Sequence, residues 1–302
     1  MNSRPTLAVS IATRNRLIDL QSTLEEVARL DPPPDEVLVC ADGCTDGTAA
    51  WVREHFPRVR LLIHEQAQGS IVSRDRILRE AVSDIVLSCD DDSHPVETDF
   101  IARVKELFAV TPRLAVVSFP QRSDEFPETL RQADFGPSLQ VGTYVNCAAA
   151  FRRSTYLDIG SFDLSFFSAY DEPDYALRCL ARDWQIHYYT GATMRHHYSS
   201  KERSELRTHH QHARNEQWSL WKRCPFPQLL FLSLFRGFRQ FQYACRRGPR
   251  WMVREPLWWL AAWRGLGAAL KERRPIPWTA YLRWLRLLRK PEPLSAAGKG
   301  AG

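Results

Sequence analysis

Three consecutive aspartates, Asp90, Asp91 and Asp92, follow the short apolar run Ile85–Leu87. Side chains alternate along an extended chain, so Asp90 and Asp92 should point to one side and Asp91 to the other. Two carboxylates on one side repel each other unless a cation lies between them, and hard oxygen ligands favour Mg²⁺ or Mn²⁺. The alternative is a solvated acidic turn or a helix cap. The position directly after a buried strand favours the metal site.

Two other loops also place polar side chains directly after apolar runs. They contain Thr13, Asn15 and Arg16 in the first loop, and residues 42–48 in the second. The carboxylate of Asp42 could accept hydrogen bonds from the base or ribose of a nucleotide. Asp-Gly pairs also favour tight turns, and Thr45 or Asp46 could cap a following helix. The second loop alone leaves both interpretations open.

An acidic cluster opens a helical stretch further along the chain, with Asp171, Glu172 and Asp174 followed by Arg178. A carboxylate here could act as a general base, because it can take a proton from a hydroxyl group within hydrogen-bonding reach. Acids at a helix N-terminus are also stabilised by the helix dipole, so a structural interpretation stays open.

Histidines occur in two groups. His196 and His197 are adjacent, and either neutral imidazole could complete a metal site. His209, His210 and His212 form the second group, which we interpret as an exposed polar face.

Short apolar runs alternate with helical patterns over the first 120 residues. The runs are Leu7–Ile11, Val37–Cys40, Leu61–Ile63, Ile85–Leu87 and Leu114–Val117. Runs that are apolar on both faces suit a buried parallel sheet, and segments 17–30 and 71–81 between them have helical spacing. This order predicts a doubly wound α/β domain, in which ligands bind beyond the carboxyl ends of the strands. From about residue 204 the pattern is helical, and residues 291–302 are predicted to be disordered.

Composition narrows the class of protein. With 302 residues, 44% hydrophobic and 25% charged, the chain is near globular averages, which excludes a collagen-like or disordered protein. The longest nearly uncharged stretch, Pro256–Trp263, is too short to span a bilayer, and we expect no signal peptide. Seven scattered cysteines without a CxxC pair argue against a disulfide framework or structural zinc, and fit a reducing cytosol.

Charge is divided unevenly along the chain. Residues 201–302 contain 21 Lys/Arg, 6 Asp/Glu and eight of the ten tryptophans, whereas residues 1–200 carry a net charge of −9. In the segment 279–290 one helical face is apolar and the other basic, the apolar residues being Tyr281, Trp284, Leu285 and Leu288. Such a helix, together with Trp258, Trp259 and Trp263, suits an anionic membrane surface. The alternative is a helix packed on the body of the protein.

Taken together, the motifs resemble those of family 2 glycosyltransferases of the GT-A fold, over residues 5 to about 230. The matching segments, in chain order, are 13–16, 41–48, 69–76, 90–92, 160–163, 171–175 and 196–199. The chain departs from the family pattern at Arg14, where Tyr is usual, at Ala41, where Asp is usual, and at Asp75, where Asn is commoner. The first two acids of the segment 171–175 are also swapped.

The resemblance implies a role for each residue. Asp42 would contact the nucleobase, Arg74 the diphosphate region, and Asp90 the ribose. Asp92 would bind the metal ion. The remaining implied contacts are those of Thr13, Asn15, Arg16 and Asp91 with the donor, and those of Asp174 and Arg178 on the acceptor side.

Two assignments stay open under this resemblance. Glu172 aligns with the catalytic base, but the swapped pair leaves Asp171 as a contender. His196 would be a further metal ligand, with His197 as the alternative.

The implied activity is that of an inverting glycosyltransferase, a hexosyl- or deoxyhexosyltransferase using a nucleotide-diphosphate sugar. A divalent cation, Mg²⁺ or Mn²⁺, would neutralise the departing diphosphate, while a carboxylate takes the proton of the acceptor hydroxyl. We expect a glycan or lipid-linked acceptor, and a cytoplasmic enzyme that is peripheral on the inner face of the cytoplasmic membrane. The catalytic domain would span residues 1–203, with its donor half ending near 119, and a basic helical extension would follow over 204–290.

Two other classes of protein are disfavoured. A sugar-nucleotide nucleotidyltransferase usually has a Gly-rich basic loop after its first strand, and this chain has none there. A nucleic-acid-binding protein would explain the basic residues, but no recognised nucleic-acid motif accompanies them.

Overall fold

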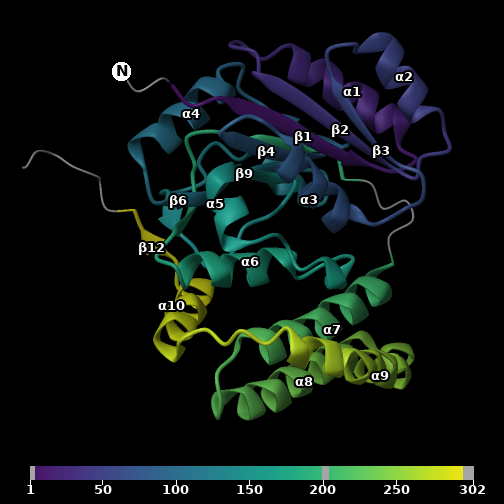
Figure 1. Ribbon diagram of the computed structural model, residues 1–302, viewed down its shortest axis with the longest axis vertical. Coiled ribbons are helices and arrows are strands. Elements are labelled where there is room, and N and C mark those ends of the chain that lie inside the picture. Colours follow the sequence, from purple (N-terminus) through teal and green to yellow (C-terminus); the bar gives the residue numbers. More distant parts are fainter. Residues whose placement is uncertain (1–3, 199–203, 295–302) are drawn as a thin grey trace, which may run out of the picture.

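A nine-stranded mixed sheet forms the centre of the computed structural model, which describes residues 4–198 and 204–294 (Figure 1). In spatial order its strands are β12 (Glu292–Pro293), β8 (Leu139–Gln140), β10 (Gln185–Tyr188), β6 (Leu114–Ser118), β9 (Ala148–Arg152), β4 (Ile85–Asp90), β1 (Leu7–Thr13), β2 (Glu36–Asp42) and β3 (Arg60–His64). The strands β4, β1, β2 and β3 are parallel, whereas β9 runs antiparallel between β4 and β6. All five predicted strands are present, so the predicted α/β class is confirmed.

Helices cover both faces of this sheet. They are α1 (Leu17–Ala28), α2 (Thr48–His55), α3 (Ser70–Glu80), α4 (Phe100–Val110), α5 (Arg153–Ile159) and α6 (Asp171–Leu180), with short 3₁₀ turns at Pro127–Arg131 and Leu164–Phe166. Leu7, Val9 and Ile11 of β1 pack in the cluster that contains α1 and α4, while Ala8 packs in the cluster that contains α3, α5 and α6. Side chains alternate along the strand, so a strand that is apolar on both faces contributes to a hydrophobic core on each side of the sheet.

A small second sheet lies at the end of β4. Its strands are β5 (Ser93–Pro95), β11 (Met194–His196) and β7 (Gln121–Ser123), with β11 in the middle. The pairing sets His196 opposite Ser93, and the backbone N–H of His197 donates to the carbonyl of Asp92 at 2.7 Å. This sheet therefore brings the late histidines next to the three aspartates.

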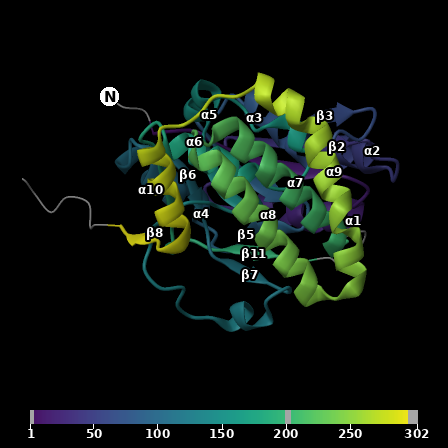
Figure 2. The ribbon, with the colours of Figure 1, turned by 90° about the horizontal axis from the view of Figure 1, so that it is seen from below.

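Four helices follow: α7 (Glu205–Arg223), α8 (Gln228–Arg247), α9 (Pro249–Lys271) and α10 (Trp278–Arg289). α7 lies between the sheet domain and the pair α8–α9, which Figure 1 shows on the side of the molecule opposite the sheet; in Figure 2, seen from below, α7 is visible between α8 and α9. Within the two described ranges, no helix combines the length and the apolar character that crossing a membrane requires. The proposed domain boundaries stay predictions.

The helix at 279–290 does form, but its apolar face is not free. Tyr281, Trp284 and Leu287 are buried in a cluster that also contains residues of α6, and the indole N–H of Trp284 donates to the carbonyl of Gly142 at 2.9 Å. The prediction that this face contacts a membrane is therefore wrong. An amphipathic pattern identifies the buried face of a helix, but it does not identify what covers that face.

Two smaller predictions also need correction. His209 is buried and its Nε2 lies 2.7 Å from Glu255, so it does not belong to an exposed polar face. The C-terminal segment was predicted to be disordered from Pro291, but Glu292 and Pro293 pair with β8. The rest of that segment, residues 295–302, lies outside the described residues.

The packing of α10 predicts the effect of substitutions along this helix. Trp284→Ala removes a large buried side chain and its hydrogen bond, so we expect the free energy of unfolding to fall by about 3–5 kcal/mol. Leu282→Ala, on the exposed side of the same helix, should change it by roughly 0.5 kcal/mol or less. Urea denaturation measures both variants, and equal, mild losses would contradict the packed position of α10.

Candidate active site

The three aspartates lie where β4 ends. Asp92 Oδ1 lies 3.4 Å from Nε2 of His196, and a carboxylate oxygen of Asp90 also comes within 4.8 Å of a ring nitrogen of that histidine. Asp91 points toward Thr13, whose hydroxyl donates to it at 2.8 Å. His196 therefore lies beside both Asp90 and Asp92, while Asp91 contacts Thr13.

Arg16 joins two of these carboxylates. Its Nη1 lies 2.9 Å from Asp91 and its Nη2 lies 2.7 Å from Asp92. Burial raises the pKa of Asp91 to about 7, with further contributions from Asp90 and Asp92, although Arg16 and Thr13 oppose the shift. Burial likewise acts to raise the pKa of Asp92, but the neighbouring His196 and the hydrogen-bonded Arg16 outweigh it and lower that pKa. The positive charge of Arg16 thus offsets part of the negative charge of Asp91 and Asp92.

Neighbouring loops are tied together at this edge of the sheet. Asn15 has a left-handed backbone, with a φ of 53°, which asparagine tolerates better than most residues. Its side-chain oxygen accepts a hydrogen bond from the backbone N–H of Thr45 at 2.7 Å. Asn15 therefore holds the loop after β1 against the loop after β2.

Asp42 anchors a third loop. Its buried carboxylate accepts hydrogen bonds from the backbone N–H groups of Gln68 (2.7 Å) and Gly69 (2.8 Å), and lies 3.0 Å from Nδ1 of His64. Gly69 has a φ of 98°, and a Cβ there would lie 2.8 Å from the carbonyl oxygen of Phe167. In this structure Asp42 shapes the loop that leads to α3, and its contact with a nucleobase stays a prediction.

α3 presents Arg74 to the acids. Its Nη2 pairs with Asp90. Burial acts against the charged guanidinium, but the carboxylates of Asp90, Asp171 and Glu172 outweigh it and raise the pKa of Arg74. Arg74 thus links the aspartates at the end of β4 with the acidic pair at the start of α6.

That acidic pair combines one held and one accessible carboxylate. Asp171 is buried and accepts a hydrogen bond from Asn146 Nδ2 at 2.7 Å, whereas Glu172 is partly exposed. Burial raises the pKa of both groups. Repulsion from Asp171 adds to the rise in the Glu172 pKa, and Arg74 opposes it in both cases. A carboxylate with a raised pKa and access to solvent is suited to accept a proton at neutral pH.

The turn before this pair is strained and is held from α7. Phe167, Ala169 and Tyr170 all have positive φ values, of 65°, 69° and 70°. Asn215 of α7 has no exposed surface, and its amide group donates to the carbonyls of Phe166 (3.1 Å), Ser168 (2.8 Å) and Ala169 (2.8 Å). Such conformations persist only where the surroundings fix them. Sequence analysis did not identify Asn215, because nothing local marks an asparagine that bonds a turn 46 to 49 residues earlier.

The two candidate histidines have different surroundings. His196 is buried beside Asp92. His197 is half-exposed, with its Nε2 3.3 Å from that of His94 and its Nδ1 3.7 Å from Asp124. Of the two, His196 is the one next to the aspartates, and its role as a ligand stays a prediction.

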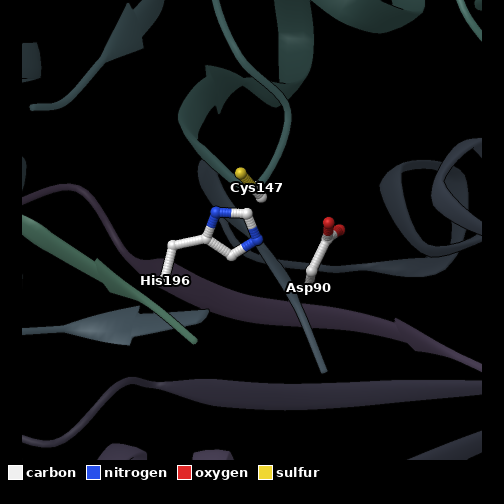
Figure 3. A group of neighbouring side chains, drawn as sticks. All are labelled: Asp90, Cys147 and His196. Atoms are coloured by element: carbon white, nitrogen blue, oxygen red, sulfur yellow. The ribbon is translucent and has the colours of Figure 1, made fainter. Parts of the chain in front are cut away.

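Cys147 joins this cluster, although no spacing pattern in the sequence marks it. One ligand atom from each of Asp90, Cys147 and His196 lies within 4.8 Å of the other two, and Figure 3 shows the three side chains converging from different elements. Burial, reinforced by Asp90, raises the pKa of the Cys147 thiol, so the group is protonated in the absence of a cation. Oxygen, nitrogen and sulfur together could hold a divalent transition metal.

Asp174 and Arg178 lie in a separate network. The side chain of Asp174 has no exposed surface, and it bonds Arg178 (3.0 Å), Arg223 (3.3 Å) and Ser219 (2.8 Å). Arg178 also donates to the carbonyls of Gly160 and Ser161. These bonds join α6 to α7, and the acceptor-side role of Asp174 and Arg178 stays a prediction.

Comparison with known proteins identifies the class of this site and fold. The sequence matches the model of the family described as glycosyl transferase family 2 over residues 8–175, more than half of the chain. The chain belongs to glycosyl transferase family 2. It is a nucleotide-sugar-dependent glycosyltransferase, of class EC 2.4.

Individual relatives agree with this assignment. The chain is 25% identical over 190 residues to the uncharacterized glycosyltransferase YwdF of Bacillus subtilis (strain 168), covering 60% of this chain and 69% of YwdF. The mannosyltransferase PcManGT from Pyrobaculum calidifontis, in complex with GDP-Man and Mn²⁺, has a TM-score of 0.58 at 21% identity, over 93% of this chain and 79% of its own. Residues 1–349 of TarS from S. aureus have a TM-score of 0.60 at 16% identity, over 91% and 82%. The predicted GT-A fold with a helical C-terminal region is confirmed.

The hold of Asn215 on the strained turn generates a prediction. Asn215→Ala removes three hydrogen bonds to the turn that positions Asp171 and Glu172, so we expect kcat to fall roughly tenfold to a hundredfold. The KM for the donor should change little, because Arg16 and Arg74 are untouched. Gln217→Ala is the matched control, since this buried amide on the same helix bonds Ser233 on α8 instead. Steady-state kinetics of both variants measure the difference, and equal effects would contradict it.

Proposed function

We propose that the protein is an inverting, cation-dependent transferase that moves a hexosyl or deoxyhexosyl group from a nucleotide-diphosphate sugar. Its acceptor would be a hydroxyl group of a glycan or lipid-linked saccharide, at the inner face of the cytoplasmic membrane. The observation that carries this proposal is the acidic pair at the start of α6. Asp171 is buried and bonded to Asn146, whereas Glu172 is partly exposed, and Arg74 lies close enough to act on the charge of both.

In the proposed mechanism Glu172 accepts the proton of the acceptor hydroxyl as it attacks the sugar. Asp171 stays bonded to Asn146 and keeps the pKa of Glu172 high through its charge. Arg74, between the acids and the end of β4, would bind the diphosphate region. Attack opposite the leaving group inverts the anomeric centre and requires no covalent intermediate.

Asp92 and His196 would hold the divalent cation, with Asp90 and Cys147 beside them. Support comes from the convergence of these side chains and from PcManGT, whose structure contains Mn²⁺ and GDP-Man. A cation bound there would neutralise the charge of the leaving diphosphate. Arg16 now pairs with Asp91 and Asp92, so it is the group that a bound cation would compete with.

The assignment of the base leads to a kinetic prediction. Glu172→Gln keeps the shape but removes the proton acceptor, so we expect kcat to fall about 10²–10⁴-fold with donor binding nearly intact. Because Glu172 must be deprotonated to act and its pKa is raised, the wild-type rate should decline as the pH falls through a value above the usual carboxylate range. That acidic limb should be absent in Glu172→Gln. If Asp171→Asn is crippling and Glu172→Gln is mild, the base is Asp171.

The assignment of the cation site leads to a binding prediction. Asp92→Ala and His196→Ala should each weaken Mn²⁺ binding in the presence of nucleoside diphosphate by roughly tenfold or more, as followed by the loss of the free Mn²⁺ signal in electron paramagnetic resonance. His197→Ala is the matched control and should bind normally. Full activity of the wild type in excess chelator would contradict the cation requirement.

The reaction class is tested by its products. A panel of sugar nucleotides incubated with the protein and Mn²⁺ should release free nucleoside diphosphate from the true donor. Release of pyrophosphate would indicate nucleotidyl transfer instead.

A further inference from the structure

The outer face of α8 and α9 is apolar and exposed. On α8 the exposed stripe has helical spacing and consists of Phe231, Leu234, Phe238, Phe241 and Cys245. On α9 a matching stripe consists of Val253, Leu257 and Leu260. Three of these side chains are more than 70% exposed: Phe231 at 71%, Leu234 at 77% and Val253 at 80%. We call these two stripes the α8–α9 face.

Nothing in the described parts of the chain covers the α8–α9 face. The opposite sides of both helices pack on α7, as the hydrogen bonds from Gln217 to Ser233 and from Trp218 to Ala262 show. Large contiguous apolar patches on a protein surface mark interaction sites. The face therefore needs an external partner.

Charge indicates which partner this is. Arg250 and Arg264 continue the α9 stripe at its two ends, with the same spacing of three or four residues, and both are exposed. Arg239 and Arg246 flank the α8 stripe and are exposed as well. The acid within these two helices, Glu255, is buried. A second copy of the chain would place these arginines against one another, whereas an anionic bilayer complements them and accepts the apolar side chains.

A cavity of about 120 Å³ lies between α7, α8 and α9, and Leu234 of the α8–α9 face borders it. Its walls are mainly aromatic and aliphatic and come from α7, α8 and α9, including Trp218, Trp221, Trp258, Trp259 and Trp263. Trp263 is 66% exposed, so the cavity reaches the outer surface. Apolar cavities of this size stay dry and take small apolar groups. A hydrocarbon chain is the apolar group that a bilayer supplies.

We propose that the α8–α9 face lies on an anionic bilayer, with the end of one lipid acyl chain in the tryptophan-lined cavity. This inference rests on the membrane location in the proposed function, and it names α8 and α9 as the contact in place of α10. The long axes of both helices lie along the bilayer surface, because the stripes run along them. The arginines reach the lipid headgroups from the ends and edges of the face.

Vesicle sedimentation tests the face. The full chain should sediment with vesicles of phosphatidylglycerol and phosphatidylcholine, less with phosphatidylcholine alone, and less at high salt. Phe231→Glu and Val253→Glu should abolish most of the binding, while Val110→Glu, at an equally exposed apolar residue of α4, should not. Arg250→Ala and Arg264→Ala should each weaken binding about fivefold, against no change for Arg53→Ala on α2. Wild-type behaviour of Phe231→Glu and Val253→Glu would overturn the proposal.

Fluorescence tests the cavity. Five of the ten tryptophans line it, so phosphatidylglycerol brominated on its acyl chains should quench much of the emission. Gly237→Leu grows into the cavity, since a Cβ there would meet Trp259 only at an ordinary 3.7 Å. This variant should sediment with vesicles but lose most of the quenching. Equal quenching in Gly237→Leu and wild type would overturn the placement of the acyl chain.

Two further measurements separate the possible failures. Release of nucleoside diphosphate by Phe231→Glu in solution should match the wild type, so loss of membrane binding can be told apart from loss of the proposed transferase activity. In analytical ultracentrifugation the wild-type protein should be a monomer, and so should Phe231→Glu. A wild-type dimer that dissociates in Phe231→Glu and ignores anionic vesicles would assign the face to a second copy and overturn the proposal.

Discussion

The constraint on which the site depends is the amount of negative charge gathered at one edge of the sheet. Five carboxylates from two elements meet there, and within the described residues the arginines that contact them are Arg16 and Arg74. Burial and mutual repulsion raise the pKa of Asp91 and Glu172. Keeping these groups ionised in the free protein is therefore energetically unfavourable. A cation and a donor diphosphate that enter such a site meet groups already oriented for them, which is how preorganised electrostatics acts in catalysis.

Much of the remaining structure keeps these acids in place. The polar loops lie at the carboxyl ends of parallel strands. The hydrogen bonds of the sheet do not join these loops to one another, so side chains must do so. Asn15 ties the first loop to the second, and Asp42 ties the second to the loop before α3. Asn215 then fixes the strained turn before Glu172 from α7. The C-terminal helices therefore help to build the candidate active site, since a side chain from α7 holds the turn that positions Glu172, the proposed base.

The sequence predicts what depends on local pattern. The five strands and the loops that end at Thr13, Asp42 and Asp92 follow from apolar periodicity and short motifs. Cys147 and Asn215 escape this reasoning, because their partners are far away in the chain and neither belongs to a recognisable spacing. The helices after residue 204 show a third case. The pattern after residue 204 predicts helices and an amphipathic segment at 279–290, but only the fold reveals that α10 covers α6 while α8 and α9 expose their apolar stripes.

α7 connects the candidate active site with the α8–α9 face. Asn215 and Ser219, one helical turn apart, bond the turn before α6 and the carboxylate of Asp174. Trp218 and Trp221 of the same helix line the cavity between α7, α8 and α9. A helix rises 1.5 Å per residue, so the groups that bond the turn before Glu172 and the groups that line the cavity lie within one or two turns of each other. If the α8–α9 face lies on a bilayer as proposed, α7 would fix the height of Glu172 above it, and an acceptor hydroxyl carried on a lipid would meet the proposed base at a distance that α7 sets.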